Sequence, residues 1–275
     1  MIDAGGGEKL ENWNGIILRR PDPVAVWPKK QSEPLWNFPH ATYHRSNKGG
    51  GSWQFHKKIP IHWQITYGDL RFHLRPTPFK HTGLFPEQAV NWDWLRTTVA
   101  AAPQSPQILN LFAYSGAATV AAASAGASVC HVDASKSVVS WARDNLKLSG
   151  LADRPVRWIV DDALKFLERE ARRAKKYDAI IMDPPSYGRG SSGEKWQFED
   201  HIARLLGACA RLLSHKQPLF ILINSYTTGF SPLIWPALLD CAGLKGKTEL
   251  CELALPLACR PLLLPCGTTA RWTPL

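Results

Sequence analysis

Residues 179–187, with the sequence Ala-Ile-Ile-Met-Asp-Pro-Pro-Ser-Tyr, constrain the fold more than any other part of this chain. The apolar run predicts a buried β-strand, and the two prolines that follow lack backbone N–H groups and cannot continue it. The strand must therefore end near Asp183 and leave backbone carbonyls free. Open α/β sheets bind ligands at the carboxyl ends of their strands, where we expect Asp183 and Tyr187. The alternative is a turn that only closes a core strand.

A second strand-and-turn pattern lies upstream, in residues 107–127. Residues 108–112 read as a short buried strand, Ser115 and Gly116 as a turn, and the Ala-rich run after them as a helix packed close to a sheet. Gly116 would let a ligand approach the backbone, and the helix N-terminus would offer free amides. A single glycine makes a poor dinucleotide fingerprint, and the Gly-Lys-Ser/Thr of a phosphate loop is missing.

Aspartates follow two further predicted strands. The strand 128–132 ends at Asp133 and precedes a helix at 135–149; the strand 156–160 ends at Asp161 and Asp162 and precedes a helix at 163–174. Asp133 follows the first strand by the roughly 20 residues at which a ribose-binding carboxylate sits in nucleotide-binding βαβ units. Each aspartate alone is equally explained as a helix N-cap. Together they favour a ligand with several hydroxyl and amino donors.

In order and spacing, these segments resemble the class I S-adenosylmethionine (SAM)-dependent methyltransferases, in particular the bacterial branch that contains 23S ribosomal RNA methyltransferases. The likeness covers residues 80–226 and rests on five motifs: Lys80 to Gln88, Asn110 to Gly116, Val132 to Ser135, Asp161 to Ala163, and Met182 to Tyr187. The resemblance implies SAM as cofactor, S-adenosylhomocysteine as product and ribosomal RNA as partner.

The resemblance also implies which residues bind SAM: Thr82, Phe85, Gln88, Tyr114, Ser115, Gly116, Asp133, Ala134, Ser135, Asp162, Ala163 and Asp183. In this assignment the turn 114–116 lines the methionine part and Asp133 accepts the ribose hydroxyls. Asp162, with the backbone of Ala163, reads the adenine amino group. The residues at 82, 85 and 88 close the pocket from the amino-terminal side; their alternative is a plain loop leading into a helix at 87–101.

The implied catalytic residues are Asp183, Pro184, Pro185 and Tyr187, which would face the transferred methyl group and the target base. Relatives that methylate cytosine C5 carry a nucleophilic cysteine after the fifth strand, but residues 224–226 here are Asn-Ser-Tyr. Cytosine C5 is not nucleophilic without covalent addition, and a serine without an obvious base is a weak substitute. A nitrogen acceptor needs only a methyl donor held in line, roughly 3 Å away. The sequence therefore favours N-methylation.

Composition indicates an intracellular protein with a polyanionic partner. The net charge of +10 suits nucleic acid, although the cations are dispersed and an ordinary basic protein would also have this charge. Six cysteines without a Cys-x-x-Cys pair favour free thiols in a reducing compartment over disulfides or zinc, and the histidine spacing is no metal pattern. We expect no bound metal, no membrane span, no signal peptide and a cytoplasmic location.

The first 78 residues predict a small antiparallel β subdomain ahead of a methyltransferase domain at 79–275. Residues 53–55, 61–67 and 70–74 alternate between apolar and polar side chains, and Gly68-Asp69 reads as a hairpin turn. The aromatic and cationic side chains of this subdomain either stack on RNA bases or form its own core.

The carboxyl-terminal part predicts the rest of the sheet. A Gly/Ser-rich loop at 188–196 is expected to cover the substrate, with Trp196 either stacking on a base or packing on a helix at 198–213. A strand at 218–225, a helix at 232–242 and strands at 248–255 and 268–273 would complete a seven-stranded, mostly parallel Rossmann-like α/β sheet. The segment 256–265 has no assigned role, and the oligomeric state stays open.

Two other functions fit the same motifs. One is a SAM-dependent methyltransferase that acts on a small molecule or a protein, and the other is a SAM-binding module without catalysis. A narrow, acid-free pocket and the absence of a basic surface would favour the first.

Overall fold

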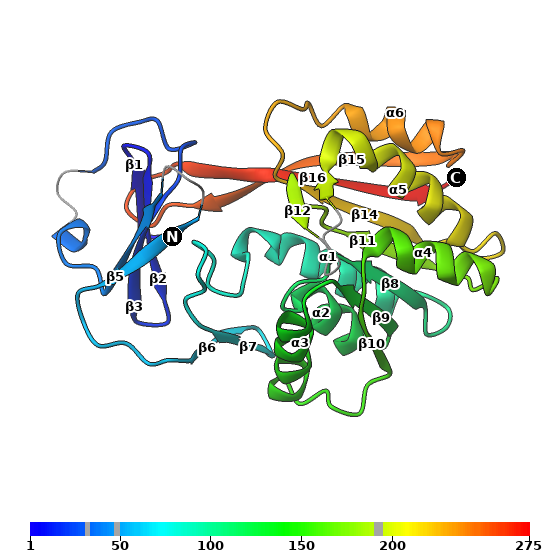
Figure 1. Ribbon diagram of the computed structural model, residues 1–275, viewed down its shortest axis with the longest axis horizontal. Helices are drawn as coiled ribbons and strands as arrows, with labels where there is room; N and C mark the ends of the chain where they lie inside the picture. Colours follow the sequence, from blue (N-terminus) through cyan, green and yellow to red (C-terminus); the bar gives the residue numbers. More distant parts are fainter. Residues whose placement is uncertain (31–33, 47–49, 190–194) are drawn as a thin grey trace. The chain divides into compact units, whose positions relative to one another are not determined.

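The computed structural model describes residues 1–30, 34–46, 50–189 and 195–275. The chain forms two compact units: the first contains Met1–Glu87 and Leu253–Cys266, and the second contains Gln88–Glu252 and Gly267–Leu275. The expected fold class is confirmed, because a seven-stranded, mostly parallel sheet with helices occurs together with a separate small sheet at the N-terminus (Figure 1).

The large sheet has the strand order β10-β9-β8-β11-β14-β16-β15. Its strands are β8 (Gln107–Leu111), β9 (Ser128–Asp133), β10 (Val156–Val160), β11 (Ala179–Met182), β14 (Phe220–Ser225), β15 (Gly246–Pro256) and β16 (Leu263–Pro274). The first five named pair in parallel, and β16 pairs antiparallel with β14. β11 and β14 are buried along their whole length, which is why they read as continuous apolar runs in the sequence.

Helices cover both faces of this sheet (Figure 1). On one face lie α1 (Ala89–Ala100), α2 (Ala117–Ser124) and α3 (Lys136–Leu148); on the other lie α4 (Ala163–Arg172), α5 (Phe198–Leu212) and α6 (Ile234–Cys241). In α4 the buried residues are Ala163, Phe166, Leu167 and Glu170, the spacing of one helical face. In α2 five consecutive residues, 119–123, are buried, so only small side chains allow the close packing of that helix.

Most predicted element ends lie within three residues of the observed ones. The helix expected at 87–101 begins as a 3₁₀ turn, η2 (Pro86–Gln88), before α1. The last two strands are longer than expected, because β16 starts at Leu263 and not at residue 268. Much of the unassigned segment 256–265 is therefore the tip of the β15–β16 hairpin.

The first unit is built on a five-stranded sheet in the order β1-β2-β3-β4-β5. Its strands are β1 (Asp3–Gly5), β2 (Glu8–Trp13), β3 (Ile16–Pro21), β4 (Ala41–Arg45) and β5 (Gly51–Phe55), with a 3₁₀ turn η1 (Pro34–Trp36) between β3 and β4. All neighbours pair antiparallel except β3 and β4. A separate hairpin joins β6 (Trp63–Tyr67) to β7 (Leu70–Leu74) through Gly68, whose φ is 57°. This confirms the predicted Gly68-Asp69 turn.

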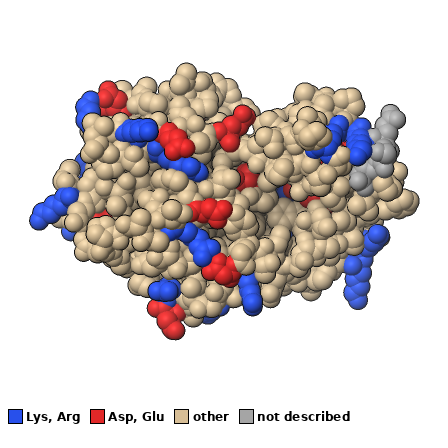
Figure 2. All heavy atoms as spheres, turned by 180° about the vertical axis from the view of Figure 1, so that it is seen from behind, with Lys and Arg blue, Asp and Glu red and all other residues tan. Residues whose placement is uncertain are grey.

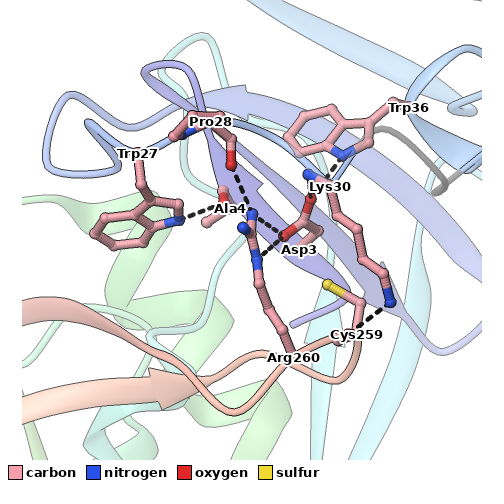
Figure 3. A network of polar contacts seen from close by, with 8 residues as sticks. All are labelled: Asp3, Ala4, Trp27, Pro28, Lys30, Trp36, Cys259 and Arg260. Carbon is pink, nitrogen blue, oxygen red and sulfur yellow. Dashed lines mark hydrogen bonds and ion pairs between the residues drawn. The ribbon is translucent and has the colours of Figure 1, made fainter.

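The tip of the β15–β16 hairpin is held in the first unit by a buried ion pair, shown in Figure 3. Arg260 Nη2 donates to Asp3 Oδ1 at 2.7 Å and to the Ala4 carbonyl at 2.8 Å. Asp3 Oδ2 accepts from the Lys30 backbone and from Trp36 Nε1, each at 2.9 Å. Burial of Asp3 raises its pKa, but these donors outweigh that effect and lower the pKa to about 2. Beside this network, Leu257 and Leu264 of the hairpin pack with Ala4 and Ala25 in a small core.

Replacing Asp3 with Asn should destabilise the first unit, because one amide cannot accept from every donor around it and Arg260 loses its counter-charge. We expect a loss of about 3 kcal/mol in the free energy of unfolding at neutral pH, measured by urea unfolding followed by tryptophan fluorescence.

The effect should also depend on pH. A lowered folded-state pKa stabilises above the unfolded pKa of about 3.9, so the difference between wild type and Asp3→Asn should be constant above that pH. It should shrink as the pH falls toward 2, the folded-state value. Asp240→Asn is the control, since that carboxylate is exposed and pairs with an exposed Lys245. Equal unfolding curves for wild type and Asp3→Asn would contradict this account.

Candidate active site

Parallel pairing sets the ends of four strands in one row. Leu111 lies level with Val132 on β9 and with Met182 on β11, and Met182 lies level with Ile223 on β14. The next residue of each strand therefore falls at the same edge of the sheet, which gives the row Asp133, Phe112, Asp183, Asn224. The strand order reverses between β8 and β11. Loops diverge at such a switch point and leave room for a ligand.

The turn between β8 and α2 is strained. Phe112, Tyr114 and Gly116 have φ values of 53°, 48° and 83°, and left-handed backbone is unfavourable for the first two. A Cβ on Gly116 would lie 2.7 Å from Cβ of Ala142 on α3, so glycine is needed here for helix packing as well as for its φ. The side chain of Asn145 on α3 holds the turn by donating to the Ser115 carbonyl at 2.8 Å. Backbone strain of this kind concentrates at binding sites.

Asp133 ties this turn to the next loop. Its Oδ2 accepts from the Tyr114 amide and its Oδ1 from the Ser135 amide, both at 2.9 Å. The carboxylate is half-buried, as are Ala134 and Ser135. Burial raises the pKa of Asp133, while the two amide hydrogen bonds act in the opposite direction. Each carboxylate oxygen retains a further lone pair, so Asp133 can accept two more hydrogen bonds from a ligand.

The aspartates after β10 have structural partners. Asp162 is the N-cap of α4, and its Oδ1 accepts from the Lys165 amide at 3.0 Å. Asp161 pairs with Arg169 at 2.6 Å. The N-cap interpretation therefore holds for Asp162, but the cap occupies only one of its two oxygens. Ala163 follows in the first helical turn, whose amides have no partner within the helix.

The loop after β11 is anchored on two sides. β11 ends at Met182, as the prolines predict; Asp183 is half-buried, Pro184 is buried, and Tyr187 is 56% exposed. The Pro185 carbonyl accepts from Trp196 Nε1 at 2.5 Å. Ser186 Oγ lies 2.9 Å from the Thr227 hydroxyl, in the loop after β14.

Trp196 belongs to a short hairpin of β12 (Tyr187–Arg189) and β13 (Lys195–Gln197). Its ring is only 8% exposed, lies 5.1 Å from the Phe112 ring and stacks on His201 of α5 at 5.3 Å. Of the two interpretations of Trp196, packing on α5 is the one observed. The rest of the loop expected to cover the substrate, residues 190–194, lies outside the described residues.

Gln88 is part of a buried polar network at the end of β14. Its Nε2 donates to the Tyr226 hydroxyl at 2.8 Å, and its Oε1 accepts from Asn91 Nδ2 at 2.8 Å. Asn91 also reaches Asn224, and Arg271 donates to Asn91. No pattern in the sequence indicates Asn91 or Arg271, because their partners lie 133 and 180 residues away along the chain.

Thr82 and Phe85 belong to the first unit, whereas all other candidate site residues belong to the second. Thr82 is wholly buried, and its carbonyl accepts from the Arg75 amide at 3.1 Å. The ring of Phe85 lies 5.0 Å from that of His81. Within the described part of the chain, no group of three His, Cys, Asp or Glu side chains could hold a metal ion. The same residues contain no helix long and apolar enough to cross a membrane.

The chemistry of this edge suits a ligand with hydroxyl and amino groups. Half-buried carboxylates at Asp133, Asp162 and Asp183 can accept hydrogen bonds, and the first turns of α2 and α4 offer amides. The row does not provide a thiol: Ser225, the last residue of β14, is 6% exposed, and its Oγ accepts from the Thr227 amide at 3.3 Å.

Comparison with known proteins agrees with this arrangement. A family model described as "S-adenosylmethionine-dependent methyltransferase" matches residues 41–239. A crystal structure of a SAM-dependent methyltransferase from Agrobacterium tumefaciens is 37% identical, with a TM-score of 0.94, and the match covers 100% of this chain and 90% of that one. A methyltransferase crystallised with SAH is 18% identical, with a TM-score of 0.76 and coverage of 98% and 72%, and shows that the fold is shared.

Curated relatives match over a shorter part of their length. A ribosomal RNA large subunit methyltransferase K/L from Shewanella frigidimarina is 35% identical over 150 residues, which is 54% of this chain and 20% of the relative. The protein of the same name from Shewanella baltica is 30% identical over 206 residues, or 70% and 28%. The chain thus corresponds to between a fifth and a third of these relatives.

Adding a side chain at Gly116 should distort the turn between β8 and α2. Gly116→Ala combines an unfavourable φ with an overlap onto Ala142, and we expect about 2–4 kcal/mol of destabilisation in urea unfolding. Gly126→Ala is the matched control, since its φ is 103° but nothing lies within 4 Å of the added Cβ. Strain alone should cost the control about 1 kcal/mol. Equal losses in the two variants would show that contact with α3 does not determine the turn.

Proposed function

The chain belongs to the S-adenosylmethionine-dependent methyltransferases, and on that premise we propose that it methylates a nitrogen atom of a ribosomal RNA base. The observation that carries the proposal is the row at the sheet edge: Asp133, Asp183 and Asn224 stand at the carboxyl ends of parallel strands of one sheet, and residues 224–226 at the end of β14 include no thiol. The names of the curated relatives support the choice of RNA.

We assign the cofactor side of this edge to the residues around Asp133. SAM supplies an electrophilic methyl group when it is bound. Asp133, already oriented by two backbone amides, would accept hydrogen bonds from the ribose hydroxyls. Asp162 has one oxygen left by its N-cap bond and, with the Ala163 amide, would bind the adenine edge. The strained turn from Tyr114 to Gly116 would line the methionine part.

The acceptor side is assigned to Asp183 and the loop after it. The half-buried carboxylate of Asp183 can accept a hydrogen bond from an amino group of the base, and the exposed ring of Tyr187 offers a stacking surface. A nitrogen lone pair needs positioning and no covalent catalyst. Ser225 is buried and hydrogen-bonded to backbone, so it is a poor nucleophile for addition to cytosine C5.

Net charge alone does not locate an RNA surface. Figure 2 shows one face of the molecule, on which Lys and Arg side chains lie scattered among acidic ones. The local sequence is more informative, because residues 34–68 contain no Asp or Glu and four cations, Arg45, Lys48, Lys57 and Lys58. This acid-free segment contributes β4, β5 and β6 of the first unit.

Part of the acid-free segment gathers exposed rings beside cations. The His40 carbonyl accepts from the amides of His56 and Lys57, which brings the two chain segments together at the end of β5, an edge strand. Phe38 and Phe55 are 63% and 54% exposed. Lys57 is exposed beside them, and its Nζ lies 3.5 Å from the Phe38 carbonyl. Exposed aromatic rings next to lysines are what single-stranded RNA needs for base stacking and phosphate contacts.

The acceptor atom can be identified from the product. With tritiated-methyl SAM and ribosomal RNA, digestion to nucleosides should yield an N-methylated base. Ser225→Ala should retain most of the activity, because no covalent step uses Ser225, whereas Asp183→Ala should lose it by at least about 100-fold, the usual range for a positioned polar group. Both variants should keep wild-type melting temperatures. Recovery of 5-methylcytidine, or a covalent adduct with fluorocytidine RNA, would refute the N-methylation proposal.

RNA binding should depend on the lysines beside the exposed rings. Lys57→Glu/Lys58→Glu should weaken RNA binding at least tenfold and flatten the plot of log affinity against log salt by about 1.4, since each phosphate contact to a single strand contributes about 0.7. Filter binding at several salt concentrations measures both. SAM affinity, measured by calorimetry, should not change.

Lys175→Glu/Lys176→Glu is the matched control for charge, because these exposed lysines belong to the second unit and precede β11, at the amino end of that strand. Phe38→Ala and Phe55→Ala test stacking and should each cost about 1–3 kcal/mol of binding. An equal loss in the two double variants, or a flat salt response, would remove the first unit as the RNA surface.

A further inference from the structure

The geometry points to a specificity-determining residue outside the recognised motifs. We propose that Arg271, acting through Asn91, fixes the amide of Asn224 so that its NH₂ group donates to a hydrogen-bond acceptor on the target base, beside the amino group that Asp183 accepts. This inference rests on the proposed function and extends it: the substrate is a base whose edge carries an acceptor atom next to an amino donor.

The direction of the hydrogen bonds starts at Arg271 of β16. A guanidinium can only donate. Arg271 Nη2 and Nε lie 2.9 and 3.2 Å from Asn91 Oδ1, and the same group lies 5.1 Å above the Trp94 ring. The oxygen of Asn91 must therefore face Arg271. The oxygen and nitrogen of an amide are usually assigned from their surroundings, and here a donor-only partner decides the assignment.

The NH₂ group of Asn91 then faces the end of β14. It donates to Asn224 Oδ1 at 2.9 Å, to Gln88 Oε1 at 2.8 Å and, at 3.3 Å, to the Thr269 hydroxyl. Both amide partners must turn their oxygens toward Asn91, so both point their own NH₂ groups elsewhere. The NH₂ group of Gln88 donates to the Tyr226 hydroxyl.

The NH₂ group of Asn224 is the end of this chain of donors. Among the residues that the structure describes, no acceptor lies within hydrogen-bonding distance of Asn224 Nδ2, although Asn224 is only 5% exposed. Its NH₂ group is therefore able to donate to a ligand that supplies an acceptor at the carboxyl edge of the sheet. The network that fixes its direction is itself buried, since Asn91 is 1% exposed.

The position of this donor suits base recognition. Asn224 follows Ile223, which is level with Met182, so Asn224 and Asp183 are neighbours at the carboxyl edge. Equivalent positions on neighbouring strands point to the same face of a sheet. A carboxylate acceptor next to an amide donor matches a base edge on which an amino group adjoins a ring nitrogen or a carbonyl oxygen. Binding of the wrong edge would place donor against donor and acceptor against acceptor, which disfavours that edge.

The test compares the natural base with an analogue. Once the methylated base is identified, an RNA oligonucleotide is made in which its acceptor atom is replaced by C–H. Wild type should methylate the analogue at least tenfold less efficiently in kcat/KM than the natural RNA, whereas Asn224→Ala should treat the two alike. Asn224→Asp, which replaces the donor by an acceptor, should lose at least tenfold on the natural RNA. Calorimetry should give SAM affinities within twofold of wild type for both variants.

Variants of Arg271 distinguish a loss of the Asn224 amide orientation from a general loss of protein stability. Arg271→Lys keeps a donor-only side chain and should keep most of the discrimination, whereas Arg271→Met should lose it. Asn110→Asp is the control: Asn110 is a buried amide of β8 that donates to Thr119 at 2.9 Å, so its replacement should lower the melting temperature without changing the ratio between the two RNAs. Asn224→Ser provides a second variant if Asn224→Ala does not fold.

The outcomes distinguish the two levels of the proposal. If wild type methylates no RNA base, the proposed function fails, and this inference fails with it. If wild type methylates RNA but Asn224→Ala discriminates against the analogue as wild type does, only the inference is overturned. It is also overturned if Asn224→Asp weakens SAM binding as much as it lowers kcat/KM.

Discussion

Parallel strand pairing is the constraint on which the rest of the site depends. Because β9, β8, β11 and β14 run in one direction and in register, residues separated by many tens of positions in the chain end at one edge. At that edge the sequence must provide residues that end a strand and whose side chains can bind a ligand. Asp133 and the Asp-Pro-Pro sequence at 183–185 meet both needs, since an aspartate begins a loop and prolines cannot extend the sheet. The side chains that we propose as cofactor and base ligands are thus brought to one edge by backbone hydrogen bonding.

Loops at such an edge have no strand partners, so buried polar side chains fix them instead. Asp133 joins two loops by accepting a hydrogen bond from a backbone amide of each, and the side chain of Asn145 donates to the Ser115 carbonyl. A buried donor or acceptor without a partner is costly, so each of these contacts specifies one loop conformation. This explains how left-handed backbone persists at Phe112 and Tyr114. The strain is concentrated where a ligand would contact the turn.

Local patterns made the strand ends and the Gly68-Asp69 hairpin predictable. The strand end at Met182 followed from two prolines, and the hairpin followed from alternation on both sides of a glycine. Pairings between distant residues could not be predicted in this way. Arg271 and Asn91 are 180 residues apart, and neither carries a local signature of its role. The β1–β4 part of the small sheet was not predicted, because its strands are short and their apolar residues follow no clear alternation. The exposure of the Phe38 and Phe55 rings likewise could not be predicted, because it depends on how much of each side chain is buried in the folded chain.

The β15–β16 hairpin shows why the carboxyl-terminal segment resisted a local interpretation. β16 contributes Leu264 to the small core of the first unit, and Ala270 and Trp272 to the large core of the second. The same strand carries Arg271, which directs the amides near Asn224, and the hairpin tip carries Arg260, which pairs with Asp3. One strand must therefore satisfy the packing of two units at once. For that reason its alternation of buried and exposed residues changes along its length. A pattern read over a few residues therefore misses the first residues of the strand.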